Sequence, residues 1–410
     1  MVLSDMMTRG IADRMDGMNP SATILLTAQA KELKRQGKDV LIFAAGEPNF
    51  NTPENVKMAA IAAIQSNVTR YTQSEGILEL RKAICEKFKR ENNINYAPDE
   101  VLVSCGAKHS LINAILAIIN PGDEVIIPVP YWVSYLSQVH LAGGISVLIE
   151  SGDDFKTKAT DIAKKITKKT KLIILNTPNN PSGMIIDKKE LKAIADLAVM
   201  HGIFVISDEV YEHFIYDNKQ HTSIASLGEE VKNITLTINA VSKSYAMTGW
   251  RIGYAAGSKH IISAMGVLQS QMTSNPSSIA QMAALEALQG QQDSIVQMRE
   301  AFVQRKEYVV NALNAIQGIH CEDPEGAFYA FFDMRALYGA KTKDGRVIND
   351  DVLFTQLLLE QQFVALIPGV EFGKPGFVRM SYATSMAELE QGIERIRLFI
   401  DSIDISGAMR

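Results

Sequence analysis

The middle of the chain alternates short apolar segments with helix-like segments, and this pattern limits the possible folds more than any other feature. Five segments rich in β-branched residues are expected to be strands: 124–128, 145–149, 171–175, 203–207 and 234–238. Amphipathic stretches separate several of them, for example 187–201, with Asp187 placed to cap that helix. The alternation predicts an α/β fold with a mostly parallel central sheet flanked by helices. Such sheets bind ligands beyond the carboxyl ends of their strands.

After about Gly257 the pattern changes to long helical stretches and separate strands. Helices are expected over 260–273, 277–289, 293–317, 349–361 and 385–401, and strands over 327–332, 363–367 and 377–381. Residues 22–36 resemble one helix that could pack against this part. We therefore expect a smaller α+β domain built from both ends of the chain. Residues 1–47 would form an N-terminal arm and part of this domain, 48–302 the large domain, and 303–410 the rest of the small domain.

Composition and motif counts exclude several classes of protein. The 410 residues are 47% hydrophobic and 21% charged, which is typical of a globular protein. A net charge of −5 argues against a nucleic-acid binder. Three cysteines without a CxxC pair and seven histidines without metal-ligand spacing predict no metal site and a cytoplasmic protein. No apolar stretch approaches the roughly 20 residues of a membrane span, and residues 1–20 lack a secretory signal.

Two segments contain residues suited to covalent chemistry on a charged cofactor. The segment AVSKSYAMTGWRIG holds Lys243 and Arg251. A lysine amine in a desolvated pocket can form a Schiff base with an aldehyde, and a nearby arginine can bind a phosphate. The segment SDEVY places Asp208 directly after an expected strand, with Tyr211 three residues further on. The Asp208 carboxylate could pair with a protonated ring nitrogen, or it could simply be a cap or turn residue.

Two further segments follow expected strands. The rigid turn NTPNNPSG contains Asn180 and exposes several amide groups. The segment SCGAKHS brings Gly106, Ala107 and Lys108 to the start of a helix, where free backbone N–H groups can cradle a phosphate. It matches neither GxxxxGK[ST] nor GxGxxG, so Walker-type and Rossmann-type sites lack their signatures.

Four isolated residues complete the candidate set. Trp132 follows a strand, where its ring could stack on a flat cofactor or fill the core. Arg379 lies among apolar residues and should face a cleft or a partner, because an unpaired buried charge is costly. Gly46 stands in a tight Gly-Glu-Pro crossing, and Tyr71 lies in a loop.

Together these motifs resemble the fold-type I, pyridoxal 5′-phosphate-dependent aminotransferases of class I/II, and among them the bacterial aspartate aminotransferase subgroup. The resemblance covers about residues 19–400. It keeps the family's linear order: AAGEPNF, YTQSEG, CGAKHS, PYWVSY, NTPNNPSG, SDEVYE, SKSYAMTGWRIGY and VRMSYATS. Any one motif is weak, and eight in this order make the match specific.

The resemblance implies how the candidates would bind the cofactor. Lys243 would hold pyridoxal 5′-phosphate as a Schiff base and later shuttle a proton. Asp208 would keep the ring nitrogen protonated, so that the ring can accept electrons. Six more residues would contact the cofactor: Tyr211 and Asn180 at the ring oxygen, Trp132 on the ring face, and Arg251 with the amides of Gly106 and Ala107 at the phosphate. Tyr71 would reach the phosphate of the neighbouring subunit, which implies a homodimer with active sites at the interface.

The resemblance also implies a substrate. Arg379 would bind the α-carboxylate in a pocket lined by Gly46, with Asn180 and Trp132 beside it. Lys108 would bind the distal carboxylate and favour aspartate and glutamate, although it could instead face the phosphate or solvent. The implied reaction is a ping-pong amino transfer from L-aspartate to 2-oxoglutarate, giving oxaloacetate and L-glutamate. An aromatic, alanine or prephenate aminotransferase, or a C–S lyase of the same fold, stays open.

Two positions depart from the family pattern. Ala240 stands where the family usually has glycine or serine, so a phosphate-binding hydroxyl is missing there, and Ser242 could partly replace it. The usual NPTG turn reads NPSG. Other classes fit less well. A transcription regulator would need an additional DNA-binding domain, and only residues 1–43 precede the first motif, AAGEPNF. A nicotinamide-linked oxidoreductase would lack its glycine signature and would leave Lys243 without a role.

Overall fold

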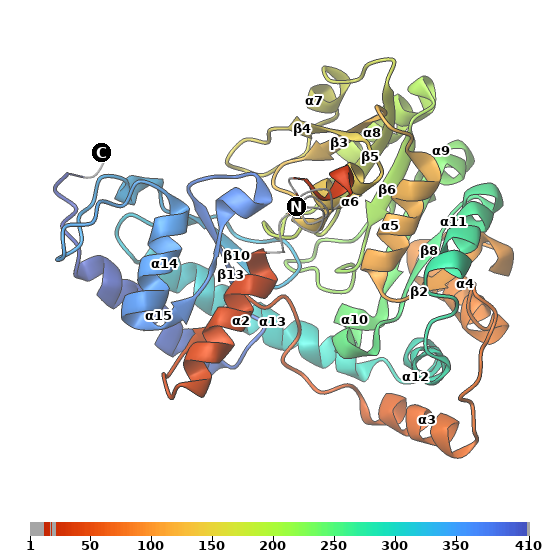
Figure 1. Ribbon diagram of the computed structural model, residues 1–410, viewed down its shortest axis with the longest axis horizontal. Helices are drawn as coiled ribbons and strands as arrows, with labels where there is room; N and C mark the ends of the chain where they lie inside the picture. The colour runs from red at the N-terminus through yellow and green to blue at the C-terminus, as the bar shows by residue number, and fades with distance from the viewer. Residues whose placement is uncertain (1–11, 17, 19–21, 408–410) are drawn as a thin grey trace, which may run out of the picture.

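The computed structural model describes residues 12–16, 18 and 22–407, so the predicted N-terminal arm lies partly outside the described residues. Seven strands form the central sheet of a large lobe, in the order β2-β8-β7-β6-β5-β3-β4 (Figure 1). They are β2 (Val101–Ser104), β3 (Glu124–Pro128), β4 (Ile145–Ile149), β5 (Thr170–Asn176), β6 (Phe204–Asp208), β7 (Thr235–Ala240) and β8 (Gly253–Ala256). Only β8 runs antiparallel to its neighbours. The predicted mostly parallel sheet is confirmed.

Helices cover both faces of this sheet because alternate side chains of each strand point to opposite faces. In β5, Leu172 and Ile174 pack with α5 and α11, whereas Ile173 and Leu175 pack with α8. The helices of the large lobe are α3 (Glu54–Gln65), α4 (Leu78–Asn92), α5 (Ala107–Ile118), α6 (Ser134–Leu141), α7 (Ala159–Ala163), α8 (Lys188–His201), α9 (Glu229–Ile234), α10 (Val241–Ser244), α11 (Lys259–Met272) and α12 (Ser278–Gln289). Strands buried on both faces read as continuous apolar runs, which is why the sequence reveals them.

The smaller lobe is built from both ends of the chain. Its antiparallel sheet has the order β12-β13-β10-β9, and β1 pairs in parallel with β11 beside it. The strands are β1 (Leu41–Ile42), β9 (His320–Cys321), β10 (Tyr329–Asp333), β11 (Val364–Ala365), β12 (Ile367–Pro368) and β13 (Phe377–Ser381). The helices are α2 (Ala22–Arg35), α13 (Asp293–Asn314), α14 (Asp351–Gln362) and α15 (Met386–Asp401). Helix α13 continues unbroken across residues 302 and 303 and extends toward the large lobe (Figure 1).

Short 3-10 helices connect several elements: η1 (Asp13–Met15), η2 (Pro98–Glu100), η3 (Ile224–Leu227), η4 (Thr248–Trp250), η5 (Arg335–Leu337) and η6 (Gly369–Phe372). Two local predictions are corrected. Asp187 stands at the start of α8, but its side chain makes no capping hydrogen bond. The single strand expected over 363–367 is two short strands in different sheets, since β11 pairs with β1 and β12 pairs with β13, with Leu366 between them. Phe363 belongs to the end of α14, where its φ is 54°.

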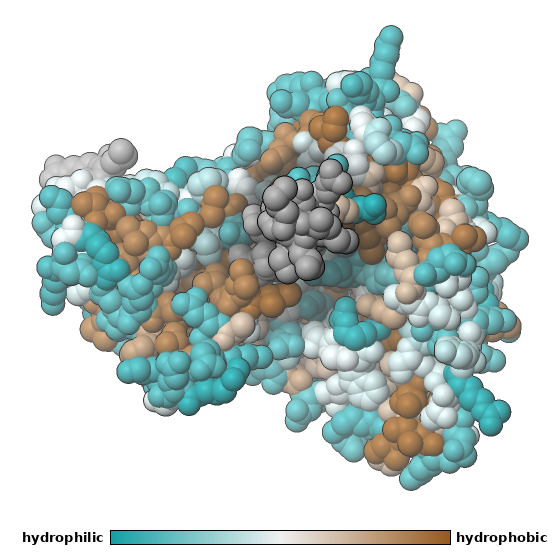
Figure 2. All heavy atoms as spheres, in the orientation of Figure 1, coloured by the Kyte–Doolittle hydropathy of each residue, from teal (hydrophilic) through white to brown (hydrophobic). Residues whose placement is uncertain are grey.

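Exposed apolar residues gather on α3. The exposed side of α3 presents Met58, Ile61 and Ile64, and brown apolar atoms gather over this helix at the lower right of Figure 2. Such a patch on a globular protein marks a site of interaction more often than a random excess of apolar residues. Among the described residues, no helix has the length and apolar character that a membrane crossing requires.

Candidate active site

A cavity of about 310 Å³ opens between the two lobes, at the carboxyl ends of β5, β6 and β7. All but two of the predicted site residues line it: Gly46, Ala107, Lys108, Trp132, Asn180, Asp208, Tyr211, Lys243, Arg251 and Arg379. Gly106 directly precedes Ala107 and packs against Arg251. Tyr71 lies on the surface with 91% of its area exposed. The cavity is therefore where the rule for parallel sheets places a ligand.

Lys243 lies on α10, the short helix that follows β7. Its Nζ donates a hydrogen bond to the carbonyl oxygen of Gly46 at 2.5 Å. Burial lowers the pKa of Lys243 to about 8, and the nearby carboxylate of Glu47 opposes this shift. A lysine with a pKa near neutral is partly unprotonated, so its amine can act as a nucleophile or as a base.

Asp208 ends β6 and is almost fully buried. Its Oδ2 accepts a hydrogen bond from the hydroxyl of Tyr135 at 2.7 Å. Burial raises the pKa of Asp208 to about 6, while the bond from Tyr135 lowers it. The carboxylate is thus ionised at neutral pH inside a cavity of low polarity, where it would attract a cationic group of a ligand.

Arg379 is a buried guanidinium in β13, with 2% of its area exposed. It donates to Asn180 Oδ1 at 2.9 Å and to the Ala44 carbonyl at 2.7 Å, while its Nε finds no partner among the described residues. No carboxylate of the described part of the chain pairs with it. Burying an unpaired charge is costly, so this guanidinium predicts an anionic ligand.

The start of α5 forms a second place for an anion. Gly106 has φ of +89°, and a Cβ there would lie 2.2 Å from Arg251 Nη2, so only glycine lets the guanidinium approach. The Gly106 N–H, which the resemblance assigned to the phosphate, instead donates to the Ser104 carbonyl at 2.7 Å, and this part of the prediction is corrected. Among the described residues no acceptor takes the N–H groups of Ala107 and Lys108. Two free amides at a helix start beside a guanidinium suit a phosphate.

Lys108 and Trp132 lie together on one side of the cavity. The Lys108 Nζ stands 4.9 Å from the centroid of the Trp132 ring. Burial, with the charge of Arg251, lowers the pKa of Lys108. Ala240 offers only a methyl group to the cavity, and the neighbouring Ser242 lines it with a hydroxyl-bearing side chain. Lys108 therefore adds a second cationic side chain to the cavity, beside the Trp132 ring.

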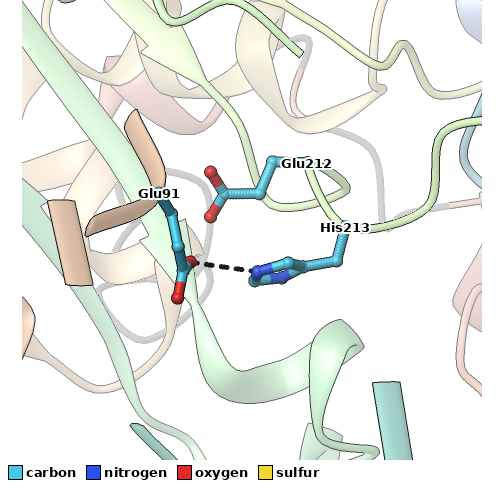
Figure 3. A group of neighbouring side chains, drawn as sticks. All are labelled: Glu91, Glu212 and His213. Atoms are coloured by element: carbon cyan, nitrogen blue, oxygen red, sulfur yellow. Dashed lines mark hydrogen bonds and ion pairs between the residues drawn. The ribbon is translucent and has the colours of Figure 1, made fainter. Parts of the chain in front are cut away.

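Glu91, Glu212 and His213 form a cluster of acidic and histidine side chains (Figure 3). Glu212 would have a raised pKa from burial alone, but the buried Lys87 ammonium in direct contact holds it far below its usual range. Lys87 pairs with both Glu212 and Glu91, and these contacts already give the buried carboxylates a cationic partner. His213 bonds Glu91 at 3.1 Å and Ser244 Oγ at 2.7 Å, which fastens the residue after Lys243.

Several cavity residues escape the sequence-based prediction, and three of them, Tyr135, Asn176 and Tyr329, carry polar groups that bond to predicted site residues. Asn176 ends β5, and its Oδ1 accepts from the Asn180 N–H at 2.8 Å, which shapes the predicted turn. The sequence could have identified Asn176 as a site residue, because it stands at the carboxyl end of a buried strand. Tyr329 lies in the apolar run YAFF, where an aromatic residue normally indicates core packing, and Tyr135 lies in α6 with no local pattern that marks its hydroxyl.

Comparison with known proteins gives one consistent result. Residues 38–396 match the family model for aminotransferase class I and II. An aspartate aminotransferase of Bacillus sp. (strain YM-2) is 48% identical over 392 residues, which cover 95% of this chain and 99% of that protein. A probable aspartate/prephenate aminotransferase of Aquifex aeolicus (strain VF5) is 45% identical, covering 97% of this chain and 100% of that protein. The crystal structure of the aspartate aminotransferase from Rhizobium meliloti superposes with a TM-score of 0.93 at 45% identity, covering 96% of this chain and 100% of that one. The chain belongs to the class I and II aminotransferase family.

Proposed function

We propose that this protein is an aspartate aminotransferase that uses pyridoxal 5′-phosphate. It would transfer the amino group of L-aspartate to 2-oxoglutarate and release oxaloacetate and L-glutamate. One observation carries the proposal: a single cavity joins the Lys243 amine, the buried Asp208 carboxylate and the Arg379 guanidinium, which lacks an acidic partner among the described residues. The names of full-length relatives support aspartate as the amino donor.

The donor set fits the cofactor. The free N–H groups of Ala107 and Lys108, with Arg251, would hold its phosphate. Asp208 would pair with the ring nitrogen, and Tyr211 and Asn180 would face the ring oxygen, with Trp132 on the ring face. When bound, pyridoxal phosphate supplies an aldehyde for the amine and a ring that accepts electrons from the substrate Cα.

The chain's own residues would then handle the substrate and its proton. Arg379 would bind the α-carboxylate through its fork of N–H groups and hold the Cα–H bond within reach of Lys243. The Lys243 Nζ would take the Cα proton as a general base and deliver it as a general acid. The Gly46 carbonyl, which accepts from this amine at 2.5 Å, would keep the amine in place.

Lys108 carries the choice of an acidic substrate. We expect Lys108→Ala to lower kcat/KM for aspartate by about 10- to 100-fold, because a charged hydrogen bond to the distal carboxylate is lost. Activity toward alanine, which has no distal carboxylate, should change far less. Steady-state kinetics with both amino acids would measure this, with the exposed Lys164→Ala as a matched control. Unchanged aspartate kinetics in Lys108→Ala would contradict this account of substrate choice.

We also propose a homodimer in which the surface around α3 is covered by a second copy. Met58, Ile61 and Ile64 are exposed there, and Tyr71 follows in the chain as a fully accessible side chain. In the dimer, Tyr71 would reach the phosphate group in the neighbouring subunit. Exposed apolar patches often mark interaction sites, and two-fold dimers are the commonest homo-oligomers of soluble proteins. Sedimentation of the purified protein would measure the assembly.

An absorbance spectrum before and after adding aspartate, without any keto acid, tests the proposal. We expect a yellow protein whose visible band disappears as the cofactor takes up the amino group. A yellow protein that responds to alanine or tyrosine but not to aspartate would keep the cofactor and overturn the substrate. A protein that stays colourless with added pyridoxal phosphate would overturn the whole proposal. Prephenate should be tried as the acceptor, because the Aquifex relative is named for both substrates.

A further inference from the structure

Tyr329 contacts three parts of the site at once. It lies on β10 in the small lobe and is fully buried. Its hydroxyl lies 2.7 Å from that of Tyr211, which belongs to the large lobe. Its ring faces the Arg379 guanidinium at 4.6 Å. Its Oη also occupies the space beside Gly46, where a Cβ would come within 2.6 Å of it. Gly46 in turn accepts the hydrogen bond from Lys243.

Strand pairing sets this arrangement. Strands β10 and β13 are antiparallel, with Tyr329 opposite Ser381 and Phe331 opposite Arg379. Residues two apart on a strand share a face, so Tyr329 is the diagonal neighbour of Arg379. The ring is therefore held by a backbone ladder against the guanidinium and does not depend on a loop.

Either hydroxyl could donate in the Tyr211–Tyr329 hydrogen bond, and the charge on Arg379 favours one direction. A cation against an aromatic ring makes the phenol a stronger donor. Burial raises the pKa of both tyrosines, and the charge of Arg379 opposes that rise at each. Because the guanidinium faces the ring of Tyr329 at 4.6 Å, we take Tyr329 as the donor and the Tyr211 oxygen as the acceptor. The Tyr211 proton is then free to point into the cavity.

We propose that Tyr329 is a positioning residue. Its hydroxyl directs the O–H group of Tyr211 toward the ring oxygen of the bound cofactor, while its ring holds Arg379 for the substrate carboxylate. This inference rests on the proposed function. It joins cofactor binding and substrate binding through one side chain of the small lobe.

The variant Tyr329→Phe separates the two roles, since it removes the hydroxyl and keeps the ring. With the cofactor bound, the O–H group of Tyr211 would stabilise negative charge on the ring oxygen and would favour loss of the proton that the visible band reports. A weaker bond from Tyr211 should therefore raise the pH midpoint of the visible band by about 0.5 to 1 unit. The KM for aspartate should stay within about twofold, because the ring still faces Arg379. In Tyr329→Leu, which loses the ring too, the KM should rise about fivefold.

A double-mutant cycle tests whether Tyr329 acts through Tyr211. In a Tyr211→Phe background, adding Tyr329→Phe should shift the midpoint no further. Tyr382→Phe is the matched control, because Tyr382 is fully buried in the same core cluster but does not line the cavity. Its midpoint should equal that of the wild type.

Gly46→Ala is a second variant that should disturb the contact between the Tyr329 and Tyr211 hydroxyls. It replaces Tyr329→Phe in the test if that variant folds poorly. Its Cβ would push the Tyr329 hydroxyl aside, so it should raise the midpoint in the same direction. An unchanged midpoint in Tyr329→Phe overturns the inference, and Gly46→Ala takes its place if Tyr329→Phe does not fold. The inference is also overturned if Tyr329→Phe shifts the midpoint equally in the wild-type and Tyr211→Phe backgrounds. Failure of the proposed function looks different, because the wild type itself would then stay colourless or ignore aspartate.

Discussion

Replacing Lys243 by alanine should abolish transamination, with kcat falling by about 10⁵-fold, the order of loss seen when a covalent catalytic group is removed. The reason is that one amine would both hold the cofactor and move the Cα proton. The structure gives it the means for both, since the Nζ lies in the cavity beside Gly46 and burial lowers its pKa to about 8. Single-turnover kinetics with aspartate would measure the loss.

Covalent attachment gives an independent measurement of the same residue. After borohydride reduction, wild-type protein should gain the mass of the cofactor, and Lys243→Ala should not. Attachment should become faster as the pH rises through about 8, because the amine loses its proton there and only the neutral form attacks an aldehyde. Lys189→Ala, an exposed position on α8, is the control and should behave as wild type. Attachment that persists in Lys243→Ala would assign the role to another lysine, with Lys108 the first candidate in the cavity.

The large lobe could be predicted from sequence because its strands are buried on both faces. Strands such as β5 and β6 are short apolar runs between amphipathic helices, and that pattern has few other solutions. The strand order and the reversed direction of β8 could not be predicted, because pairing depends on contacts between distant segments. The split between β11 and β12 was missed for the same reason, because β11 pairs with β1 and β12 with β13, each from a different part of the chain.

The active site likewise contains residues that the sequence predicts and residues that it does not. Asp208 and Asn180 could be found because polar residues stand where buried strands end. Tyr329 could not, because an aromatic residue within an apolar strand indicates core packing. Its hydroxyl gains a role only from Tyr211, which lies 118 positions away in the chain. Tyr135 is a similar case, since its partner Asp208 lies 73 positions away. Local sequence patterns show which strand ends can bind a ligand. The tyrosine hydroxyls that contact Asp208 and Tyr211 come from distant segments, so their positions depend on tertiary packing.

Asp208→Asn should reduce kcat by about 10³-fold, because an amide cannot neutralise a positively charged ring nitrogen in a buried site. The side chain keeps its shape, so the Tyr135 contact and the fold should survive. In the cofactor-free protein the pKa of Asp208 is raised by burial to about 6, so the carboxylate is charged above that pH and neutral below it. Cofactor affinity of the apoenzyme should therefore fall as the pH drops through about 6, and Asp208→Asn should lose that dependence.

Titrating the apoenzyme with pyridoxal phosphate at several pH values, and measuring kcat with aspartate, would check both parts of this prediction. Asp196→Asn is the matched control, because Asp196 is an exposed surface residue paired only with Lys192 among the described residues. It should keep wild-type affinity and rate. If Asp208→Asn retains kcat within about tenfold of the wild type, a charge pair at the ring nitrogen contributes too little to matter. The carboxylate would then act only through its hydrogen bond to Tyr135, and the protonation of the ring nitrogen would need another source.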